Sequence, residues 1–219
     1  MLTADFDYHL PEELIASAPP ERRDGARMMV VDRAAGSIAH RQFTDLAEYV
    51  HPGDIWVLNN SRVERARFFS PDGKREVLRL EAMTPLKWRC MVKPGKKFRL
   101  GDEARIGPHV GRVTGVLENG ERMIEWAEEI DEETHGHLAL PHYMNRADGE
   151  MDKERYQTVF AQDRGSIAAP TAGLHFTPET LAQIPHTFVT LHVGVGTFQP
   201  VKADRVEDHV MHSERYEVS

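Results

Sequence analysis

Six short apolar runs decide the architecture of the middle of the chain: ARFF (66–69), REVLRL (75–80), KWRCMV (87–92), ARIG (104–107), HVGRVTGVL (109–117) and RMIEWA (122–127). Turn residues such as Pro94-Gly95 separate the runs, so turns recur every eight to twelve residues or so, a spacing typical of small β-barrels and sandwiches. The sequence therefore predicts an all-β, barrel-like domain, which we place at residues 63–148 as an insertion.

The parts on either side of this region have a different texture. Helices are predicted at PEELIASAP (11–19), FTDLAEYVH (43–51), DKERYQTVF (152–160) and TPETLAQI (177–184), a hairpin at 28–40, strands at 55–58 and 186–193, and a linker at LPHYMNR (140–146). Because the content of the C-terminal part matches that of the N-terminal part, we expect one discontinuous α/β domain, residues 1–62 and 149–219, interrupted by the barrel.

Composition sets the class of protein. A chain of 219 residues with 40% hydrophobic and 28% charged residues fits one large or two small globular domains. No stretch approaches the roughly 18 consecutive apolar residues of a membrane helix, and the N-terminus lacks a signal-peptide pattern, so we expect a cytoplasmic protein with no membrane partner. The single cysteine, Cys90, excludes an internal disulfide, and its neighbours WRCMV predict a buried position without a chemical role.

Charge is distributed unevenly along the chain. The net charge is −8, but residues 118–134 hold eight acids against Arg122, whereas residues 62–112 hold fourteen Lys/Arg and six Asp/Glu. The basic block could face phosphates. A solvated β-surface with ordinary lysines explains the same composition, and composition alone favours it.

Two loops combine histidine with glycine and end in proline: AAPTAGLHFTP (168–178) and LHVGVGTFQP (191–200). Glycine at 173, 194 and 196 lets the backbone approach a ligand closely, while His175 and His192 supply imidazole groups, a side-chain type suited to acid–base catalysis. The pattern predicts an active site, although a lone histidine is more often a hydrogen-bonded structural residue.

The stretch PGDIWVLNNSRV (52–63) places polar residues after a short apolar run, which predicts a buried strand ending at Asn59 and Asn60. Polar side chains at the C-terminal end of a buried strand often face a ligand. A turn that merely uses asparagine is an equally good interpretation.

Nine segments together resemble the S-adenosylmethionine:tRNA ribosyltransferase-isomerases of the bacterial queuosine pathway. They are DFDYHLPEELIASAP, RDGARMMVVDRAAGSIAHRQFTDL, PGDIWVLNNSRV, MVKPGKK, LPHYMNR, DKERYQTVFA, AAPTAGLHFTP, TLHVGVGTFQPV and HVMHSERYEV, in family order and over nearly all of the chain. The resemblance implies an α/β domain with an inserted β-barrel. It also implies transfer and isomerisation of the ribosyl part of S-adenosylmethionine onto the 7-aminomethyl group of 7-aminomethyl-7-deazaguanine (preQ1) at the tRNA wobble position, giving epoxyqueuosine, adenine and methionine.

The resemblance also implies that S-adenosylmethionine is consumed as a cosubstrate, so that neither a separate cofactor nor a metal is needed, and it suggests a monomer. Family members continue for roughly a further third beyond the point that matches Tyr216-Glu217-Val218, so we expect the second part of the α/β domain to be incomplete here. Where many members read Val-Ile-Pro-Ala-Arg, this chain reads Val63-Glu64-Arg65-Ala66-Arg67.

Roles follow for individual residues. His175 or His192 is the expected general base, acting on a ribose proton or on the attacking amine. The turn Gly194-Val195-Gly196-Thr197 is expected to bind the methionine carboxylate through backbone N–H groups and a hydroxyl, with Thr171 and Gly173 acting on the other side. Asn59, Asn60 and Arg62 are expected to reach the modified base or the ribose. The expected phosphate contacts, which would hold the tRNA anticodon loop, are Arg65, Arg67, Lys93, Lys96 and Lys97.

Two other functions remain open at this point. One is a truncated, catalytically silent tRNA-binding paralogue that keeps the barrel. The other is a metal-dependent hydrolase, because His209 and His212 are spaced i, i+3 and could share a helical face; the chemistry implied by the resemblance needs no metal. His135 and His137 follow the acidic run, and we expect them to be exposed.

Overall fold

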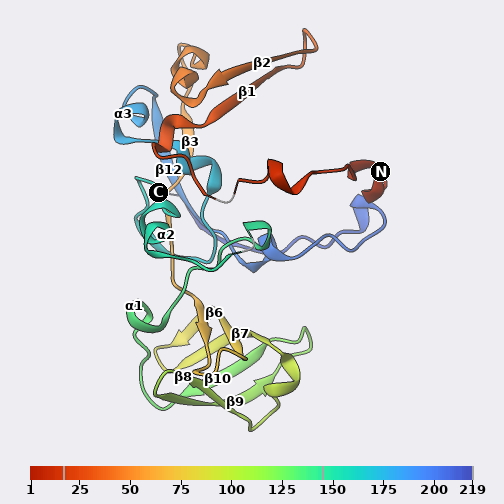
Figure 1. Cartoon of the computed structure of the whole chain (residues 1–219), viewed down its shortest axis with the longest axis vertical. Helices are drawn as coiled ribbons and strands as arrows, with labels where there is room; N and C mark the ends of the chain where they lie inside the picture. Colours follow the sequence, from red (N-terminus) through yellow and green to blue (C-terminus); the bar gives the residue numbers. More distant parts are fainter. Residues whose placement is uncertain (17, 145, 219) are drawn as a thin grey trace. The chain divides into compact units, whose positions relative to one another are not determined.

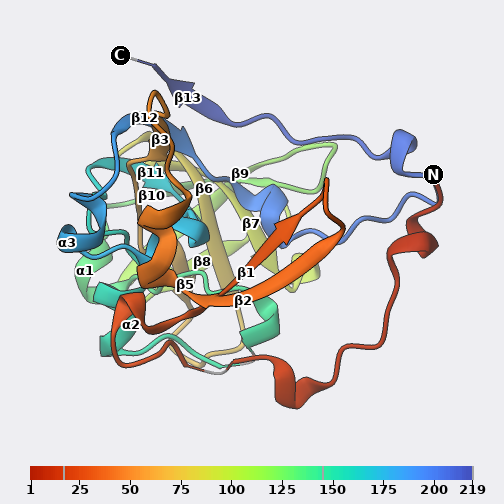
Figure 2. The same cartoon turned by 90° about the horizontal axis from the view of Figure 1, so that it is seen from above.

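The computed structural model describes residues 1–16, 18–144 and 146–218 (Figures 1 and 2). The chain forms two compact units, Met1–Val63 together with Pro141–Ser219, and Glu64–Leu140. The domain extents expected from the sequence, 1–62, 63–148 and 149–219, stay predictions about independently folding units; by contacts, residues 141–148 group with the first unit.

The second unit is a six-stranded antiparallel sheet. Its strands are β5 (Arg67–Phe69), β6 (Glu76–Thr84), β7 (Lys87–Lys93), β8 (Glu103–Ile106), β9 (His109–Val116) and β10 (Arg122–Trp126), in the spatial order β5-β6-β7-β10-β9-β8. The first and last strands of that order, β5 and β8, contact each other, so the sheet is nearly closed (Figure 1). The predicted barrel-like domain is confirmed.

The interior of the barrel follows from alternation along its strands. Ala104 and Ile106 of β8 are buried while their neighbours are exposed, and β10 buries Ile124 and Trp126 in the same way. Successive side chains of a strand point to opposite faces, so this pattern fills one face with apolar groups. Aromatic rings complete the core, with the Trp88 ring centroid 5.2 Å from that of Trp126.

Cys90 is fully buried in this core, as its neighbours predict. Burial raises the pKa of its thiol well above the usual range, because the thiolate would lose its hydration. The thiol is therefore a packing group and not a nucleophile.

Glu64 has a structural partner inside the barrel unit. Its carboxylate lies 3.1 Å from Arg79, and the same guanidinium contacts Glu132. Arg79 also lies over the Trp88 ring, 5.0 Å from the centroid. The acid that distinguishes this chain at position 64 is thus half of a charge pair that covers the aromatic core.

Within its described residues, the first unit contains three small sheets. The hairpin of β1 (Arg27–Asp32) and β2 (Ser37–Gln42) is one; β4 (Ser61–Val63) pairs in parallel with β11 (Asp163–Ser166) in the second; in the third, β12 (His186–His192) lies between β3 (Trp56–Asn59), parallel to it, and β13 (Arg215–Glu217), antiparallel. The α-helices α2 (Glu150–Arg155) and α3 (Pro178–Leu181) belong to this unit and α1 (Glu132–His135) to the barrel unit. The expected discontinuous α/β class is confirmed.

Many of the helical turns are 3₁₀ turns. They lie at Thr3–Phe6, Glu12–Leu14, Arg23–Gly25, Phe43–Tyr49, Gly95–Lys97, His142–Met144, Thr171–His175, Val195–Phe198 and Val206–Asp208. Among the helices of the described residues, none combines the length and apolar content needed to cross a bilayer.

Two predictions about local structure were wrong. Residues 11–19 do not form a continuous helix: among the residues of this segment that the structure describes, only Glu12–Leu14 makes a turn, all three of these residues are exposed, and prolines bound the segment. An isolated helix of this length gains too little without packing to offset its nucleation. The strand at 55–58 is not buried on both faces either, because Trp56 and Leu58 pack on the core of Phe43, Phe176 and Ile184, whereas Ile55 and Val57 are exposed.

Predicted helices elsewhere are shorter than the sequence pattern suggests. The segment 43–51 forms a 3₁₀ helix that ends at Tyr49, the helix in 152–160 ends at Arg155, and that in 177–184 ends at Leu181.

Replacement of Gly111 by alanine should destabilise the barrel. A methyl group at this position would lie 2.6 Å from Trp126 Cε3, inside the packed core, and overpacking of this kind costs about 1–3 kcal/mol. Urea unfolding followed by tryptophan fluorescence measures the change. The matched control is Gly95→Ala, which would meet only the flexible end of Arg122 at 3.5 Å; equal stability of the two variants would contradict the packing described here.

Candidate functional site

The two Gly/His loops begin side by side. AAPTAGLHFTP follows β11 and LHVGVGTFQP runs out of β12. The Ile167 amide donates to the Val193 carbonyl at 2.9 Å, and the Val193 amide donates to Ser166 Oγ at 3.0 Å. Residues 26 positions apart in the sequence are thereby joined where both loops leave the sheet.

Ser166 is held in turn by Ser61, a residue that the sequence did not single out. Its hydroxyl donates to Ser61 Oγ at 2.7 Å, and both side chains are fully buried. Buried hydroxyls need such partners, because leaving water without a hydrogen bond is unfavourable. No motif in the sequence marks the two serines; only the parallel pairing of β4 with β11 brings them together.

Asn59 is built into the sheet. Its Nδ2 donates to the Leu191 carbonyl at 2.8 Å, and its Oδ1 accepts the amides of Leu191 and Ser61, each at 3.0 Å. The side chain thus continues the pairing of β3 with β12 by one residue, which is a structural task. Its predicted contact with substrate stays a prediction.

Asn60 belongs to a polar cluster with Asp163 and Thr190. Its Nδ2 donates to Asp163 Oδ2 at 3.0 Å, and Thr190 Oγ1 lies 2.7 Å from Asn60 Oδ1 and 3.0 Å from Asp163 Oδ2. The hydroxyl has one proton, so it donates to one of these oxygens at a time. Arg62, the next candidate, is exposed, and within the described residues its guanidinium makes no hydrogen bond or ion pair.

His192 packs on the backbone of Gly165. Gly165 has a φ of 137°, and a Cβ there would lie 2.8 Å from His192 Nδ1. This nitrogen is buried and has no hydrogen-bond partner among the described residues. The ring is therefore held by packing on Gly165, and a fully hydrogen-bonded histidine does not describe this side chain.

The expected carboxylate-binding turn already holds a carboxylate. The Gly194 amide donates to Glu214 Oε1 at 2.7 Å, and a Cβ at Gly196 would lie 2.6 Å from the His212 ring. The segment before β13 therefore covers the turn. Thr197 is exposed. The Gly194 amide thus binds a carboxylate of the chain itself, and its predicted contact with the methionine carboxylate stays a prediction.

The first loop forms a 3₁₀ turn, Thr171–His175, whose middle residue is buried. A Cβ at Gly173 would lie 2.9 Å from Thr158 Cγ2 and 3.0 Å from Phe160 Cζ. Only glycine lets the turn settle this closely on the core. The His175 ring then lies 5.3 Å from that of Phe43, half-buried.

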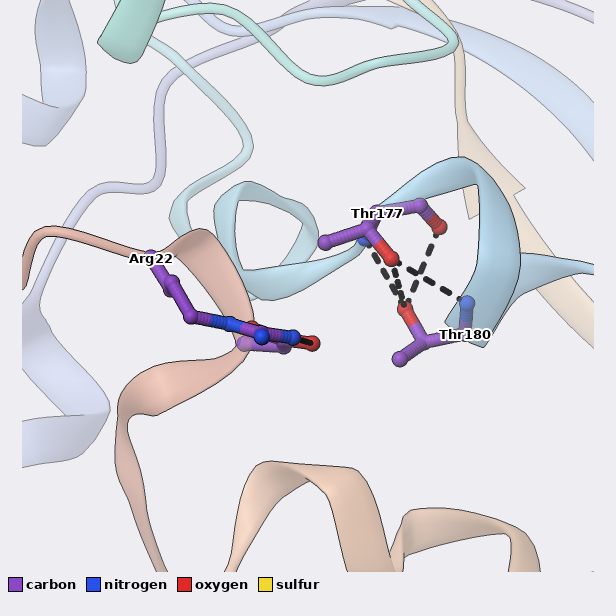
Figure 3. Close-up of polar contacts among 4 residues, drawn as sticks. Arg22, Thr177 and Thr180 are labelled. Atoms are coloured by element: carbon purple, nitrogen blue, oxygen red, sulfur yellow. Dashed lines mark hydrogen bonds and ion pairs between the residues drawn. The ribbon is translucent and has the colours of Figure 1, made fainter.

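The loop ends at a strong helix cap (Figure 3). The Thr177 amide donates to Thr180 Oγ1 at 2.8 Å, the Thr180 amide donates to Thr177 Oγ1 at 3.2 Å, and Pro178 occupies the first turn of α3. These features satisfy amides that would otherwise be unpaired at a helix start. Arg22, also drawn in Figure 3, pairs with Asp24 at 2.9 Å.

A pocket of about 320 Å³ opens beside the first loop. Thr171 and His175 both line it, whereas His192 does not. The described residues that form its wall are Ile15, Ala16, Ala18, Pro19, Pro20, Arg23, Tyr143, Met144, Asp152, Arg155, Tyr156, Thr171, Leu174 and His175. The structure therefore assigns the two histidines to different surroundings, although their loops share a base.

Two arginines fix the wall of this pocket. Arg23 donates to the carbonyls of Gln157 at 2.7 Å and Glu154 at 2.6 Å, and Arg155 donates to those of Glu21 and Pro20, each at 2.8 Å. The irregular segment before β1 is thereby tied to the end of α2. This pocket depends on contacts that no local sequence pattern reveals.

The candidate cations of the barrel fall into two groups. Arg65 pairs with Glu133 at 2.7 Å, and Arg67 donates through two nitrogens to Glu76 at 2.8 and 3.0 Å. Both guanidiniums are half-buried. Their charge is compensated by carboxylates, which weakens the expectation that they contact phosphates.

Lys93, Lys96 and Lys97 are exposed, and within the described residues their ammonium groups make no hydrogen bond or ion pair. Lys96 and Lys97 line a groove of about 860 Å³ together with Asp72, Lys74, Arg75, Pro94, Arg99, Asp102 and Glu103. Five cationic and three acidic side chains line this groove, so its net charge is positive.

The remaining histidines differ from expectation. His209 and His212 do not share a helical face, because the 3₁₀ turn ends at Asp208 and the residues after it are irregular. In the described part of the chain, no group of three or more His, Cys, Asp or Glu is arranged to hold a metal. His135 and His137 are half-buried rather than exposed, since their rings pack on His109 and Phe69 at 5.0 and 5.2 Å.

The two loop glycines should respond differently to alanine. Gly173→Ala forces a methyl group against buried Thr158 and partly buried Phe160 and should cost about 1–3 kcal/mol of stability. Gly194→Ala meets only Glu214, at 3.6 Å, and should leave the unfolding temperature nearly unchanged. Thermal unfolding of both variants checks this, and a more harmful Gly194→Ala would contradict the geometry of the two loops.

Comparison with known proteins shows the family to which the chain belongs. The family described as "Queuosine biosynthesis protein" matches residues 3–219. The S-adenosylmethionine:tRNA ribosyltransferase-isomerases of Finegoldia magna and Clostridioides difficile are 44% and 45% identical over the whole chain, which covers 67% and 68% of those proteins. That of Syntrophomonas wolfei is 43% identical over 98% of the chain and 65% of its own length.

This chain is also similar to a crystal structure of S-adenosylmethionine tRNA ribosyltransferase from Thermotoga maritima. The sequence identity is 32%, the match covers 86% of this chain and 58% of the Thermotoga maritima chain, and the TM-score is 0.35. The chain thus spans about two thirds of the length of the curated relatives that it matches. Since the match is continuous and includes both Gly/His loops, the chain belongs to the queuosine biosynthesis protein family.

Proposed function

We propose that this protein acts as an S-adenosylmethionine:tRNA ribosyltransferase-isomerase. It transfers and isomerises the ribosyl part of S-adenosylmethionine onto the aminomethyl group of preQ1 in tRNA, and adenine and methionine leave. Curated relatives of that name match the whole chain at about 44% identity. The observation that carries the proposal is the junction of Ser166, Ile167 and Val193, which joins the bases of the two histidine loops.

The chemistry needs a proton acceptor. The sulfonium of S-adenosylmethionine is a fixed positive charge beside the ribose C5′, so it acidifies the neighbouring C–H bonds and makes a thioether leaving group. The attacking amine must also lose a proton. Imidazole suits both tasks near neutral pH. His192 offers a buried, unpartnered Nδ1, and His175 stands at the wall of the pocket.

The methionine part of the cosubstrate carries a carboxylate. In our proposal this carboxylate binds the Gly194 amide and the following turn, with Thr197 as a further donor. Glu214 holds that amide at 2.7 Å, so the substrate carboxylate would take the place of the Glu214 side chain. Thr171 and Gly173 shape the opposite loop, and Asn59, Asn60 and Arg62 remain candidates for contacts with the base or the ribose.

For tRNA, the positive groove on the barrel is the proposed phosphate contact. Lys96 and Lys97 line it without carboxylate partners of their own, and Lys93 precedes them. Such contacts would hold the anticodon loop, whose wobble base is unpaired and costs little to extrude. A monomeric, cytoplasmic protein without a separate cofactor stays a prediction.

The reaction itself is the first test. The 219-residue chain is incubated with S-adenosylmethionine and tRNA carrying preQ1, and digestion followed by mass spectrometry measures epoxyqueuosine and free adenine. We expect both products. Absence of both, with tRNA binding intact, would overturn the proposed activity for this chain and favour a silent tRNA-binding protein.

His175→Ala and His192→Ala should each lower the rate of that reaction. Loss of a positioned acid or base costs roughly 10²- to 10⁴-fold. His51→Ala is the matched control, because that side chain is exposed and, within the described residues, its one ion-pair partner is Asp54. If both variants kept the full rate, neither histidine would be the general base.

Lys96→Ala/Lys97→Ala should weaken tRNA binding in a salt-dependent manner. Each lost phosphate contact removes about one unit from the slope of log K against log salt concentration, so the double variant should lose about two units. The control is Lys87→Ala, an exposed lysine that does not line the groove. Filter binding between low and physiological salt measures the slopes, and equal slopes would refute the groove as the phosphate contact.

A further inference from the structure

Two arginines lie opposite each other on adjacent strands of the first unit. Arg62 of β4 and Arg164 of β11 are register partners in the parallel pair, and both are exposed. Ser61 and Val63, on either side of Arg62, are buried, so the Arg62 side chain points away from the core. Like charges opposite each other on neighbouring strands are unfavourable. Packing of the sheet therefore does not account for this pair.

A third arginine, Arg215 of β13, reaches the same part of the sheet. It is the register partner of His192. A Cβ on Gly165, the residue after Arg164, would lie 3.3 Å from Arg215 Nη2 and 2.8 Å from His192 Nδ1. Only the missing side chain of Gly165 leaves room for both groups. The guanidinium of Arg215 is thus placed beside His192 and next to the strand that carries Arg164.

Two of the three guanidiniums have no partner in the protein. Within the described residues, Arg62 and Arg215 make no hydrogen bond or ion pair, whereas Arg164 has an interaction of its own. An unpaired guanidinium presents a planar fork of N–H donors that matches the oxygens of a phosphate. The available donors are therefore of the kind that binds phosphate.

The acids that precede two of these arginines in the chain do not neutralise them. Asp163 Oδ2 accepts from Asn60 Nδ2 at 3.0 Å, and Glu214 Oε1 accepts from the Gly194 amide at 2.7 Å. Neither carboxylate forms an ion pair within the described residues. Three arginines and two acids leave this surface with a positive net charge.

The arrangement suits a chain of phosphates better than one small anion. The arginines belong to β4, β11 and β13, and paired strands are about 5 Å apart. A single ion is best held by donors that converge on one point, whereas donors on successive strands match phosphates that follow one another along a polynucleotide.

We propose that Arg62, Arg164 and Arg215 bind the phosphate groups of a polynucleotide backbone and hold it beside His192. The inference rests on the proposed function for the identity of the polynucleotide, a tRNA. It goes beyond that function by assigning an RNA contact to the α/β unit, and to Arg164 and Arg215, for which the sequence predicted no role. A phosphate adjoins a ribose, so the contact is compatible with the one expected for Arg62.

The test measures RNA binding in the absence of S-adenosylmethionine. An unmodified tRNA transcript is titrated with the 219-residue chain by filter binding at several salt concentrations. Arg62→Ala/Arg215→Ala removes the two unpaired cations and should take about two units from the slope of log K against log salt concentration. Arg62→Lys/Arg215→Lys keeps both charges and should retain the slope.

Two controls accompany this measurement. Arg33→Ala removes an exposed arginine of the same unit, in the turn between β1 and β2, and should leave the slope unchanged. Calorimetric titration with inorganic phosphate alone tests for a site that takes a free ion, and we expect no binding that depends on Arg62 or Arg215. Thermal unfolding of Arg62→Ala should show no loss of stability, because the substitution removes a like charge opposite Arg164.

The outcomes separate this inference from the proposed function. A smaller slope for the double alanine variant, with the lysine variant and Arg33→Ala unchanged, supports the RNA contact even if the chain forms no epoxyqueuosine. An unchanged slope overturns the contact even if the reaction proceeds. Binding of inorganic phosphate that is lost in the double alanine variant, with the RNA slope unchanged, would make this a site for a free anion and would also overturn it.

Discussion

The candidate site depends on one short chain of hydrogen bonds, from Ser61 through Ser166 to Val193. It connects the first residue of β4 to the starts of both Gly/His loops, and its hydroxyls are buried away from water. In a medium of low dielectric constant such bonds are stronger, and an unpaired member is costly, so the arrangement is favoured over alternatives that break it. Two serine side chains, Ser61 and Ser166, therefore fix the position at which both loops begin, although neither has a proposed catalytic role.

The barrel obeys a different constraint. Its core is apolar and closed, and the charge at its border is neutralised locally, with Arg79 held between Glu64 and Glu132, and Arg67 by Glu76. Three lysines at the end of β7 and in the turn after it, Lys93, Lys96 and Lys97, have no carboxylate partner among the described residues. Packing thus separates structural cations from those available to a ligand.

This difference explains how much of the fold and of the candidate site could be predicted from the sequence. The barrel follows from alternation, as at Ala104 and Ile106, and the position of the site follows from glycine and histidine in two loops. The partners of Arg65 and Arg67 could not be predicted from the sequence. Glu133 lies 68 positions from Arg65, and counting charges does not reveal which of them form ion pairs.

Helix lengths were overestimated for a related reason. The segment 11–19 has residues that favour helix, yet it acquires no apolar face to pack, and its later part instead lines a pocket. Local preference decides little where tertiary contacts are absent. Directly after this segment, Arg155 donates to the carbonyls of Pro20 and Glu21, a long-range contact that the local sequence does not reveal.

The bond between Glu214 and the Gly194 amide has a kinetic consequence. A carboxylate on the same chain is present at an effective concentration in the millimolar range, so it competes with any free carboxylate for that amide. A ligand attached only through a carboxylate is at a disadvantage, whereas one that binds at a second point can displace the tethered group. Under the proposed activity, this competition would select the intact cosubstrate over free methionine and hasten the departure of the spent amino acid.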